Sequence, residues 1–143
     1  MKRKIYEKLL EWKETSNGRS AVLIDGARRI GKSWIAEEFA RNEYESYLLI
    51  DFSKVSKEVK GFFEDYLENP DVFFMYLLGA YNAKLTPRKS VIIFDEVQKF
   101  PRAREAIKHL VADGRFDFIE TRSLVLIGKS VAKILISIGG ASH

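Results

Sequence analysis

The chain has 143 residues, of which 46% are hydrophobic and 31% charged, and this is the composition of one ordinary globular domain. Its 24 basic and 20 acidic residues interleave and leave a net charge of +4, which favours a solvated mixed-charge surface over a nucleic-acid-binding face. The sequence has no cysteine, so disulfides and thiolate metal sites are excluded.

No part of the sequence is typical of a membrane segment or a signal peptide. Residues 1–4 are basic, but residues 5–13 carry charges where the apolar region of a signal peptide has none. The longest apolar run, residues 72–81, is too short to span a bilayer. We therefore expect a cytoplasmic protein that does not enter the membrane.

Apolar patterning predicts strands that alternate with helices. Continuous apolar runs are typical of parallel strands buried on both faces, and apolar residues three and four apart are typical of helices. Pro70 separates two helical stretches whose aromatic residues we expect to lie in the core rather than to stack on a ligand. In chain order the pattern predicts a helix over 3–15, a strand over 20–25, a helix from 34, a strand over 47–52, helices between 54 and 83, a strand over 90–95, a helix over 101–112 and strands over 116–120 and 133–138.

Residues 26–33 match the phosphate-binding loop pattern G-x-x-x-x-G-K-[ST]. The alternative is a glycine turn with a surface lysine, but the loop follows a predicted strand and precedes a predicted helix, as the motif requires. In such loops backbone N–H groups surround the phosphates, the lysine (Lys32) reaches the β and γ phosphates, and the hydroxyl of Ser33 is offered to Mg²⁺. The side chains of Arg28 and Arg29 are expected to face solvent or a partner. The residues expected at the nucleotide are Gly26, Ala27, Arg28, Arg29, Ile30, Gly31, Lys32, Ser33 and Trp34.

Two carboxylates follow the apolar strand of residues 91–94, as in a Walker B element. Asp95 is expected to hold Mg²⁺, and Glu96 to orient or deprotonate the attacking water. An acidic turn after a strand is common, so only the combination with the phosphate loop makes this interpretation specific. The adjacent Glu96 favours hydrolysis over phosphoryl transfer, and the lack of a guanine-reading motif favours ATP over GTP.

A third polar position is expected at the end of the strand over 116–120, to sense the γ-phosphate. Thr121 and Ser123 are the candidates, and a hydroxyl that caps a turn is the alternative for either. Gln98 is a further candidate for contact with the water or a neighbouring subunit, with a plain surface role equally open. His109 is expected to be a simple helix-face residue.

The blocks Gly-Ala-Arg-Arg-Ile-Gly-Lys-Ser, Ile-Ile-Phe-Asp-Glu-Val-Gln and Phe-Asp-Phe-Ile-Glu-Thr-x-Ser together resemble bacterial and archaeal AAA-type ATPases that carry a C-terminal domain of unknown function. The resemblance spans about residues 1–138. It implies a P-loop NTPase fold, a doubly wound parallel five-stranded sheet in the order 5-1-4-3-2 flanked by helices. It also implies ATP and Mg²⁺ as ligands, with Lys32, Ser33, Asp95 and Glu96 in the roles given above.

The sequence departs from this family in two respects. Arg122 stands where the family has glycine, so its side chain either clashes with the usual turn or touches phosphate. Residues 1–143 form one core domain that stops after the fifth strand, where relatives continue with a lid, a second sensor arginine and an effector region. We therefore expect a truncated product or a fragment with slow turnover.

The sequence thus predicts an ATP-binding AAA-like domain with Mg²⁺-dependent hydrolysis. The alternative is a non-catalytic, nucleotide-dependent interaction module, in which Arg122 and the missing lid have abolished turnover. DNA binding by the basic surplus is a third interpretation, which no array of aromatic and basic residues supports. The expected partners are the nucleotide and either further copies of the chain or an effector protein, and no residue is identifiable as an arginine finger.

Overall fold

The structure is a computed structural model that describes residues 2–27, 31–123 and 135–139. In chain order its elements are α1 (Lys2–Ser16), β1 (Ala21–Gly26), α2 (Lys32–Glu43), β2 (Ser46–Asp51), α3 (Lys57–Asp65), α4 (Pro70–Ala80), β3 (Ser90–Asp95), the 3-10 turn η1 (Val97–Lys99), α5 (Pro101–Asp113), β4 (Asp117–Ser123) and β5 (Leu135–Gly139). The alternation of strands and helices expected from the sequence is present, and most boundaries differ from the predicted ones by one or two residues. Within the described part of the chain, no helix is both long and apolar enough to cross a membrane.

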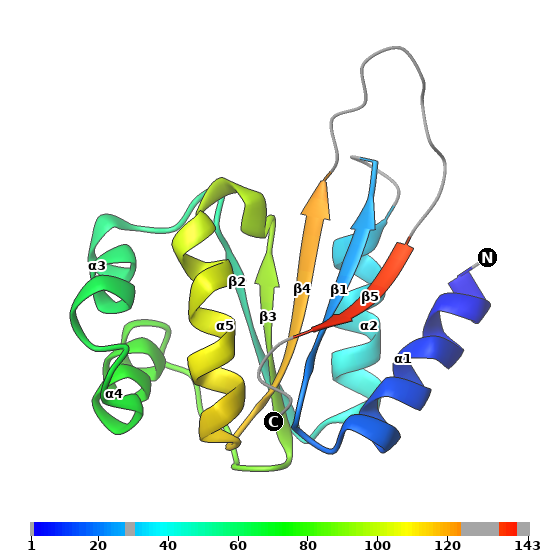
Figure 1. The fold of residues 1–143 in the computed structure, drawn as a ribbon, viewed down its shortest axis with the longest axis horizontal. Coiled ribbons are helices and arrows are strands. Elements are labelled where there is room, and N and C mark those ends of the chain that lie inside the picture. Colours follow the sequence, from blue (N-terminus) through cyan, green and yellow to red (C-terminus); the bar gives the residue numbers. More distant parts are fainter. Residues whose placement is uncertain (1, 28–30, 124–134, 140–143) are drawn as a thin grey trace.

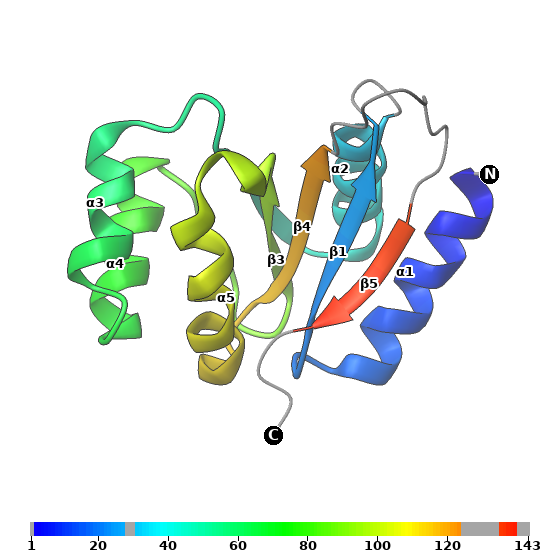
Figure 2. The ribbon, with the colours of Figure 1, turned by 45° about the horizontal axis from the view of Figure 1, so that its top comes forward.

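The strands form one sheet in the order β2-β3-β4-β1-β5 (Figure 1). Read from the other edge, this is the order 5-1-4-3-2. Neighbours among β1 to β4 pair in parallel, but β5 pairs antiparallel with β1, and Figure 2 shows the two arrows pointing in opposite directions. The expectation of an all-parallel sheet is therefore wrong for its last strand. An edge strand is paired on one side only, so its apolar pattern does not reveal its direction.

Helices cover both faces of the sheet, and each face has its own core. Alternate residues of a strand point to opposite faces, so each buried strand supplies both cores. The core beneath α1 and α2 contains Val22, Ile24, Val91, Ile93 and Ile119, and the core beneath α3, α4 and α5 contains Leu23, Ile50, Ile92, Phe94 and Phe118. A strand covered in this way must be apolar at every position, which is why β1 and β3 appear as continuous apolar runs.

The aromatic residues of α3 and α4 belong to the second core. Phe63 and Phe73 are fully buried, and their rings meet edge to face with 5.0 Å between centroids. The side chain of Asn69 accepts a hydrogen bond from the N–H of Val72, and Pro70 occupies the first turn of α4, where its missing N–H costs nothing. The core interpretation of these aromatic residues is confirmed.

β4 is longer than the sequence predicts, because it continues beyond Glu120 through Ser123. Its first residue, Asp117, is buried yet paired, since Arg88 Nη2 lies 2.9 Å from one carboxylate oxygen and the Tyr44 hydroxyl 2.6 Å from the other. At its other end β4 stays paired with β1, with Ser123 opposite Gly26. The buried charge of Asp117 is thus compensated by tertiary contacts.

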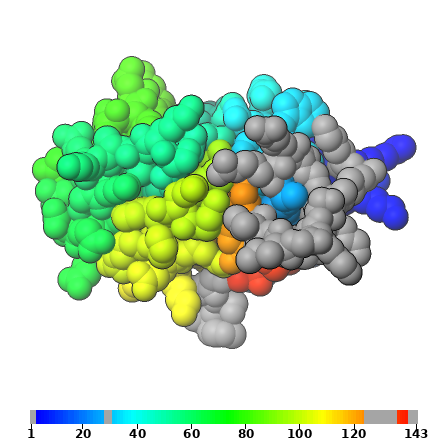
Figure 3. All heavy atoms as spheres, turned by 90° about the horizontal axis from the view of Figure 1, so that it is seen from above, coloured from blue at the N-terminus to red at the C-terminus, as the bar shows by residue number. Residues whose placement is uncertain are grey.

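The parallel strands β1, β3 and β4 all end at one edge of the sheet, the top in Figure 1. Seen from that edge, the ends of β1 and β4 lie between the α5 side and the α2 side of the molecule (Figure 3). Ligands of open α/β sheets bind beyond the carboxyl ends of the strands. The polar residues predicted from the sequence follow β1 and β3 or end β4, so the fold brings them to this edge.

Candidate nucleotide site

The described part of the phosphate loop leads directly into helix α2. Gly31 has φ 89° and ψ 23°, a left-handed conformation that glycine adopts without strain, and its carbonyl accepts the N–H of Ile35. The first N–H groups of a helix have no partner within the helix and favour an anion at its N-terminus. Arg28, Arg29 and Ile30 lie outside the described residues, so their expected contacts stay predictions.

The ammonium group of Lys32 is buried among neutral partners. The residue is 4% exposed, and Nζ donates to the carbonyl oxygen of Ala27 at 3.2 Å and to the hydroxyl of Ser123 at 3.0 Å. No ion pair joins Lys32 to a carboxylate in the described residues, and the remaining segments of the sequence contain no Asp or Glu. Desolvating a cation without a counter-charge is unfavourable, so this position favours an anionic ligand.

Ser33 and Asp95 meet across the site, 62 residues apart in the sequence. The Ser33 hydroxyl donates to Asp95 Oδ1 at 2.6 Å, and the Thr121 hydroxyl donates to the same oxygen at 2.6 Å. Hydroxyl and carboxylate oxygens are the ligands that Mg²⁺ prefers, and it usually takes one or two from protein and others from phosphate and water. No cluster of three or more His, Cys, Asp or Glu side chains occurs in the described residues.

Glu96 is held by its backbone and by both carboxylate oxygens. It has φ 56° and ψ 48°, an uncommon left-handed conformation for a residue other than glycine, and its N–H donates to Thr121 Oγ1 at 3.0 Å. Oε1 accepts the Ser123 hydroxyl at 2.7 Å, and Oε2 accepts the side-chain amide of Gln98 at 2.9 Å. The carboxylate therefore lies beside Ser123, the residue that also contacts Lys32.

The two sensor candidates occupy different places. Thr121 is fully buried and its hydroxyl joins Asp95 to the N–H of Glu96, so it braces the acidic pair. Ser123 touches Lys32 and Glu96 and lines the cavity described next. Of the two hydroxyls, that of Ser123 is the one in position to meet a ligand.

A cavity of about 460 Å³ opens at this edge, a volume within the range of small-molecule sites. Two lysines, one carboxylate and three serines from several parts of the chain contribute polar groups to its wall. Its lining residues are Gly31, Lys32, Ser33, Trp34, Ser53, Glu96, Lys99 and Ser123.

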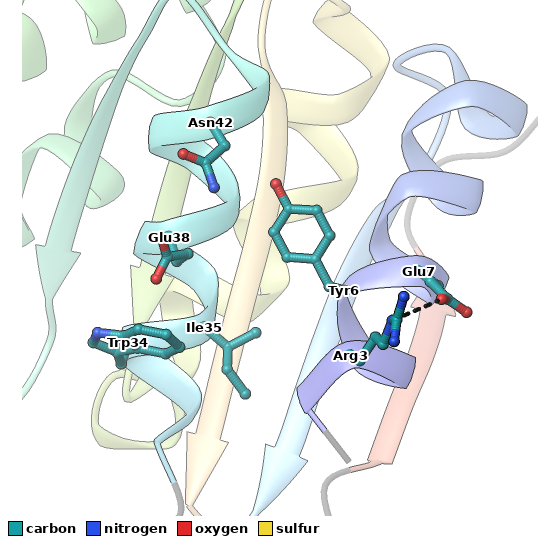
Figure 4. A pocket seen from close by; sticks show the side chains of 7 residues that line it. All are labelled: Arg3, Tyr6, Glu7, Trp34, Ile35, Glu38 and Asn42. Carbon is teal, nitrogen blue, oxygen red and sulfur yellow. Dashed lines mark ion pairs between the residues drawn. The ribbon is translucent and has the colours of Figure 1, made fainter.

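A second hollow of about 470 Å³ lies between α1 and α2 (Figure 4). Tyr6 points from α1 toward α2, where Trp34 and Ile35 lie, and Glu38 and Asn42 occupy the next turns of α2. Trp34 lines both hollows, so the aromatic hollow adjoins the phosphate end of the site. The sequence interpretation did not include this hollow.

Arg122 is paired with an acidic residue of the neighbouring strand. Its guanidinium makes two hydrogen bonds to Asp25, from Nε to Oδ1 at 2.6 Å and from Nη2 to Oδ2 at 2.8 Å. These bonds raise the pKa of Arg122 further above its ordinary value. Asp25 and Arg122 stand opposite each other in the β1–β4 register. The arginine is therefore part of a paired charge on the sheet and is not among the residues that line the cavity.

The sequence analysis missed some of the residues that the fold brings to the site. Ser53 and Lys99 line the cavity, and Asp25 is the partner of Arg122, yet none belongs to a motif. Gln98 was noted as a candidate, and the structure shows that its contact is with Glu96. His109 lies on α5, as expected, and is exposed. Asp25 meets Arg122 through long-range geometry, and Ser53, which hydrogen-bonds locally to Asp51, reaches the cavity only through the fold. Only the position of Lys99 beside the acidic pair was a local signal.

Comparison with known proteins gives one match. The chain matches the model of a family described as AAA domain over residues 18–135, which is most of its length. No curated protein and no solved structure matches. This family match indicates nucleotide binding of the ATPase type. The matched residues include the phosphate loop, the acidic pair and the residues that line the cavity between them. The chain belongs to the AAA domain family.

Proposed function

We propose that this domain binds ATP with Mg²⁺ and hydrolyses it. The observation that carries the proposal is the buried ammonium of Lys32, which faces a polar cavity and whose two direct hydrogen-bond partners are neutral. A triphosphate would supply negative charge in direct contact with it. The hollow beside Trp34 has room for the base of a nucleotide, since Tyr6, Trp34 and Ile35 offer apolar surface there beside charged and polar residues, and it therefore favours a nucleotide over inorganic phosphate.

Ser33 and Asp95 are the residues that would hold Mg²⁺, and the metal would offset negative charge on the phosphate oxygens. The chain's own groups supply the other functions. Lys32 binds phosphate oxygens, and the N-terminus of α2 adds N–H donors. Glu96 takes the proton of the attacking water or orients that water, and Ser123 hydrogen-bonds to both Lys32 and Glu96.

An arginine from another molecule would complete this site. None of the described residues that line the cavity is an arginine, and Arg122 is engaged by Asp25. Transition-state charge in phosphoryl transfer is commonly stabilised by an arginine supplied in trans. A second copy of the chain or an effector protein is the partner that this arrangement favours.

Calorimetry with ATP, with and without Mg²⁺, and measurement of phosphate release test the proposal together. We expect metal-dependent binding and slow turnover in the unmodified protein. Lys32→Ala should remove nucleotide binding, and Glu96→Gln should keep binding but remove hydrolysis. Matched controls are Lys108→Ala and Glu105→Gln, both at exposed positions of α5, which should leave binding and turnover unchanged.

Each outcome has a distinct meaning. Unaltered ATP affinity in Lys32→Ala would refute the binding site, and equal turnover in Glu96→Gln and wild type would refute the catalytic role of Glu96. Binding without turnover in the unmodified protein would select a non-catalytic, nucleotide-dependent interaction module.

A further inference from the structure

Gln98 connects the acidic pair to the end of β4. It lies in the turn η1, half-buried, and its Nε2 donates to Glu96 Oε2 at 2.9 Å. Its Oε1 accepts the backbone N–H of Ser123 at 3.3 Å. One side chain thus contacts both Glu96 and Ser123, two residues that line the cavity.

An amide is the side chain whose chemistry fits both contacts. The carboxylate of Glu96 requires a donor, and the N–H of Ser123 requires an acceptor, so one group must supply both within a few ångströms. A carboxylate at position 98 would repel Glu96, and a lysine could not accept from Ser123. The contacts also fix which end of the amide carries the nitrogen.

Gln98 does not line the cavity, whereas its two partners do. It therefore supports Glu96 from behind the cavity wall. The backbone of Glu96 is fixed separately by Thr121, so the tie to Gln98 acts on the carboxylate itself. Three rotatable bonds separate that carboxylate from the backbone, and each side-chain contact reduces its freedom.

The second hydrogen bond of the Glu96 carboxylate is to the Ser123 hydroxyl, which also bonds to Lys32. The Ser123 hydroxyl accepts from Lys32 Nζ and donates to Glu96 Oε1, so the ammonium and the carboxylate are joined through one oxygen. A phosphate bound to Lys32 competes with Ser123 for the ammonium. The Gln98 contact uses the other carboxylate oxygen and is independent of that competition.

We propose that Gln98 is a positioning residue that holds the Glu96 carboxylate in place for ATP hydrolysis while the nucleotide phosphates occupy Lys32. This inference rests on the proposed function and assigns a role within the same site. General bases contribute about 10²- to 10⁴-fold to rate, and their misplacement by about 1 Å costs up to about 10²-fold. We therefore expect Gln98→Ala to lower kcat about 10- to 100-fold.

The distinguishing readout is a split between turnover and binding, followed by a double-mutant test. In Gln98→Ala, KM and the Kd for ATP with Mg²⁺ should stay within about threefold of wild type, because Gln98 does not touch the cavity. In the Glu96→Gln background, Gln98→Ala should not lower the residual turnover any further, since the group that it positions has already gone. Gln98→Glu, which keeps the length of the side chain, should lose at least as much activity as Gln98→Ala.

A second measurement does not depend on turnover. The amide hydrogen of Ser123 should exchange at least about 10-fold faster in Gln98→Ala, whereas that of Glu96, held by Thr121, should not. His109→Ala, at an exposed position of α5, is the matched control for folding and activity. Comparison of thermal midpoints shows whether each variant is folded.

The outcomes separate this inference from the function on which it rests. If the unmodified protein binds no ATP or releases no phosphate, the proposed hydrolysis and this inference both fall. If it turns over ATP and folded Gln98→Ala matches wild type in kcat, the inference alone is overturned. Additive losses in the double variant, or an unchanged exchange rate at Ser123, would also overturn it.

Discussion

Glu120 is a buried acid whose protonation should make the stability of the protein depend on pH. It lies on β4, its side chain is 4% exposed, and Arg104 Nε of α5 lies 3.3 Å from Oε1. That contact lacks the alignment of a hydrogen bond, so Oε1 has no hydrogen-bond partner among the described residues. Burial raises the pKa of Glu120 from 4.5 to about 7, although Arg104 and Arg122 oppose the change.

The direction and size of the effect follow from this pKa. The folded state holds the Glu120 proton more tightly than the unfolded chain does. The contribution of this proton to the free energy of unfolding is therefore complete below about pH 4.5 and is lost as the pH rises through about 7. Each pKa unit is worth about 1.4 kcal/mol, so the total is about 3 kcal/mol. Most of it, about 2 to 3 kcal/mol, should be lost between about pH 5 and pH 8.

Urea unfolding of wild type and Glu120→Gln at several pH values isolates this contribution, because glutamine does not titrate. We expect the stability of the variant relative to wild type to rise by about 2 to 3 kcal/mol from about pH 5 to pH 8. Glu68→Gln, at an exposed position between α3 and α4, is the control and should show a constant difference. A constant difference for Glu120→Gln as well would refute the reasoning, since Glu120 would then titrate alike in both states.

Two further substitutions test contacts around the site. Thr121→Val should destabilise the protein by about 1 to 3 kcal/mol in urea unfolding, because it leaves the N–H of Glu96 without its acceptor. The control Thr15→Val, at an exposed position of α1, should have little effect. No measurable loss in Thr121→Val would contradict the bracing role. Arg122→Ala should lower the free energy of unfolding by about 2 to 3 kcal/mol, because it leaves the Asp25 carboxylate buried and unpaired. The ATP affinity of this variant, measured by calorimetry, should stay within about threefold of wild type. A loss of ATP affinity above about 10-fold would show that Arg122 acts on the nucleotide.

The phosphate loop, the acidic pair and the main strands could be predicted because their signals are local. Each of these signals depends on a few consecutive residues. They are glycines at fixed spacing, a lysine and a hydroxyl at the start of α2, and apolar runs that end in carboxylates. Strand β3 begins and ends where its apolar pattern predicts. Contact between Ser33 and Asp95 agrees with the pairing of these two motifs, since parallel strands place their carboxyl ends at one edge.

The roles of the polar residues at the end of β4 depended on the tertiary structure. A local pattern predicts that a strand stops at its charged residues, but pairing with β1 continues β4 through Ser123. Alternation along that strand then sends Thr121 and Ser123 to the face of α2, and Arg122 to the opposite face with Asp25. Which hydroxyl meets Lys32 is decided by this register.

Sequence alone therefore predicted a nucleotide site and the motifs that would form it, because those motifs fix the local backbone and chemistry. The pairing of Arg122 with Asp25, the tie from Gln98 to Glu96 and the antiparallel direction of β5 were decided only by the folded structure. Each joins groups whose meeting depends on strand register, chain direction or side-chain conformation. These are set by the packing of the whole sheet, and no short stretch of sequence encodes them.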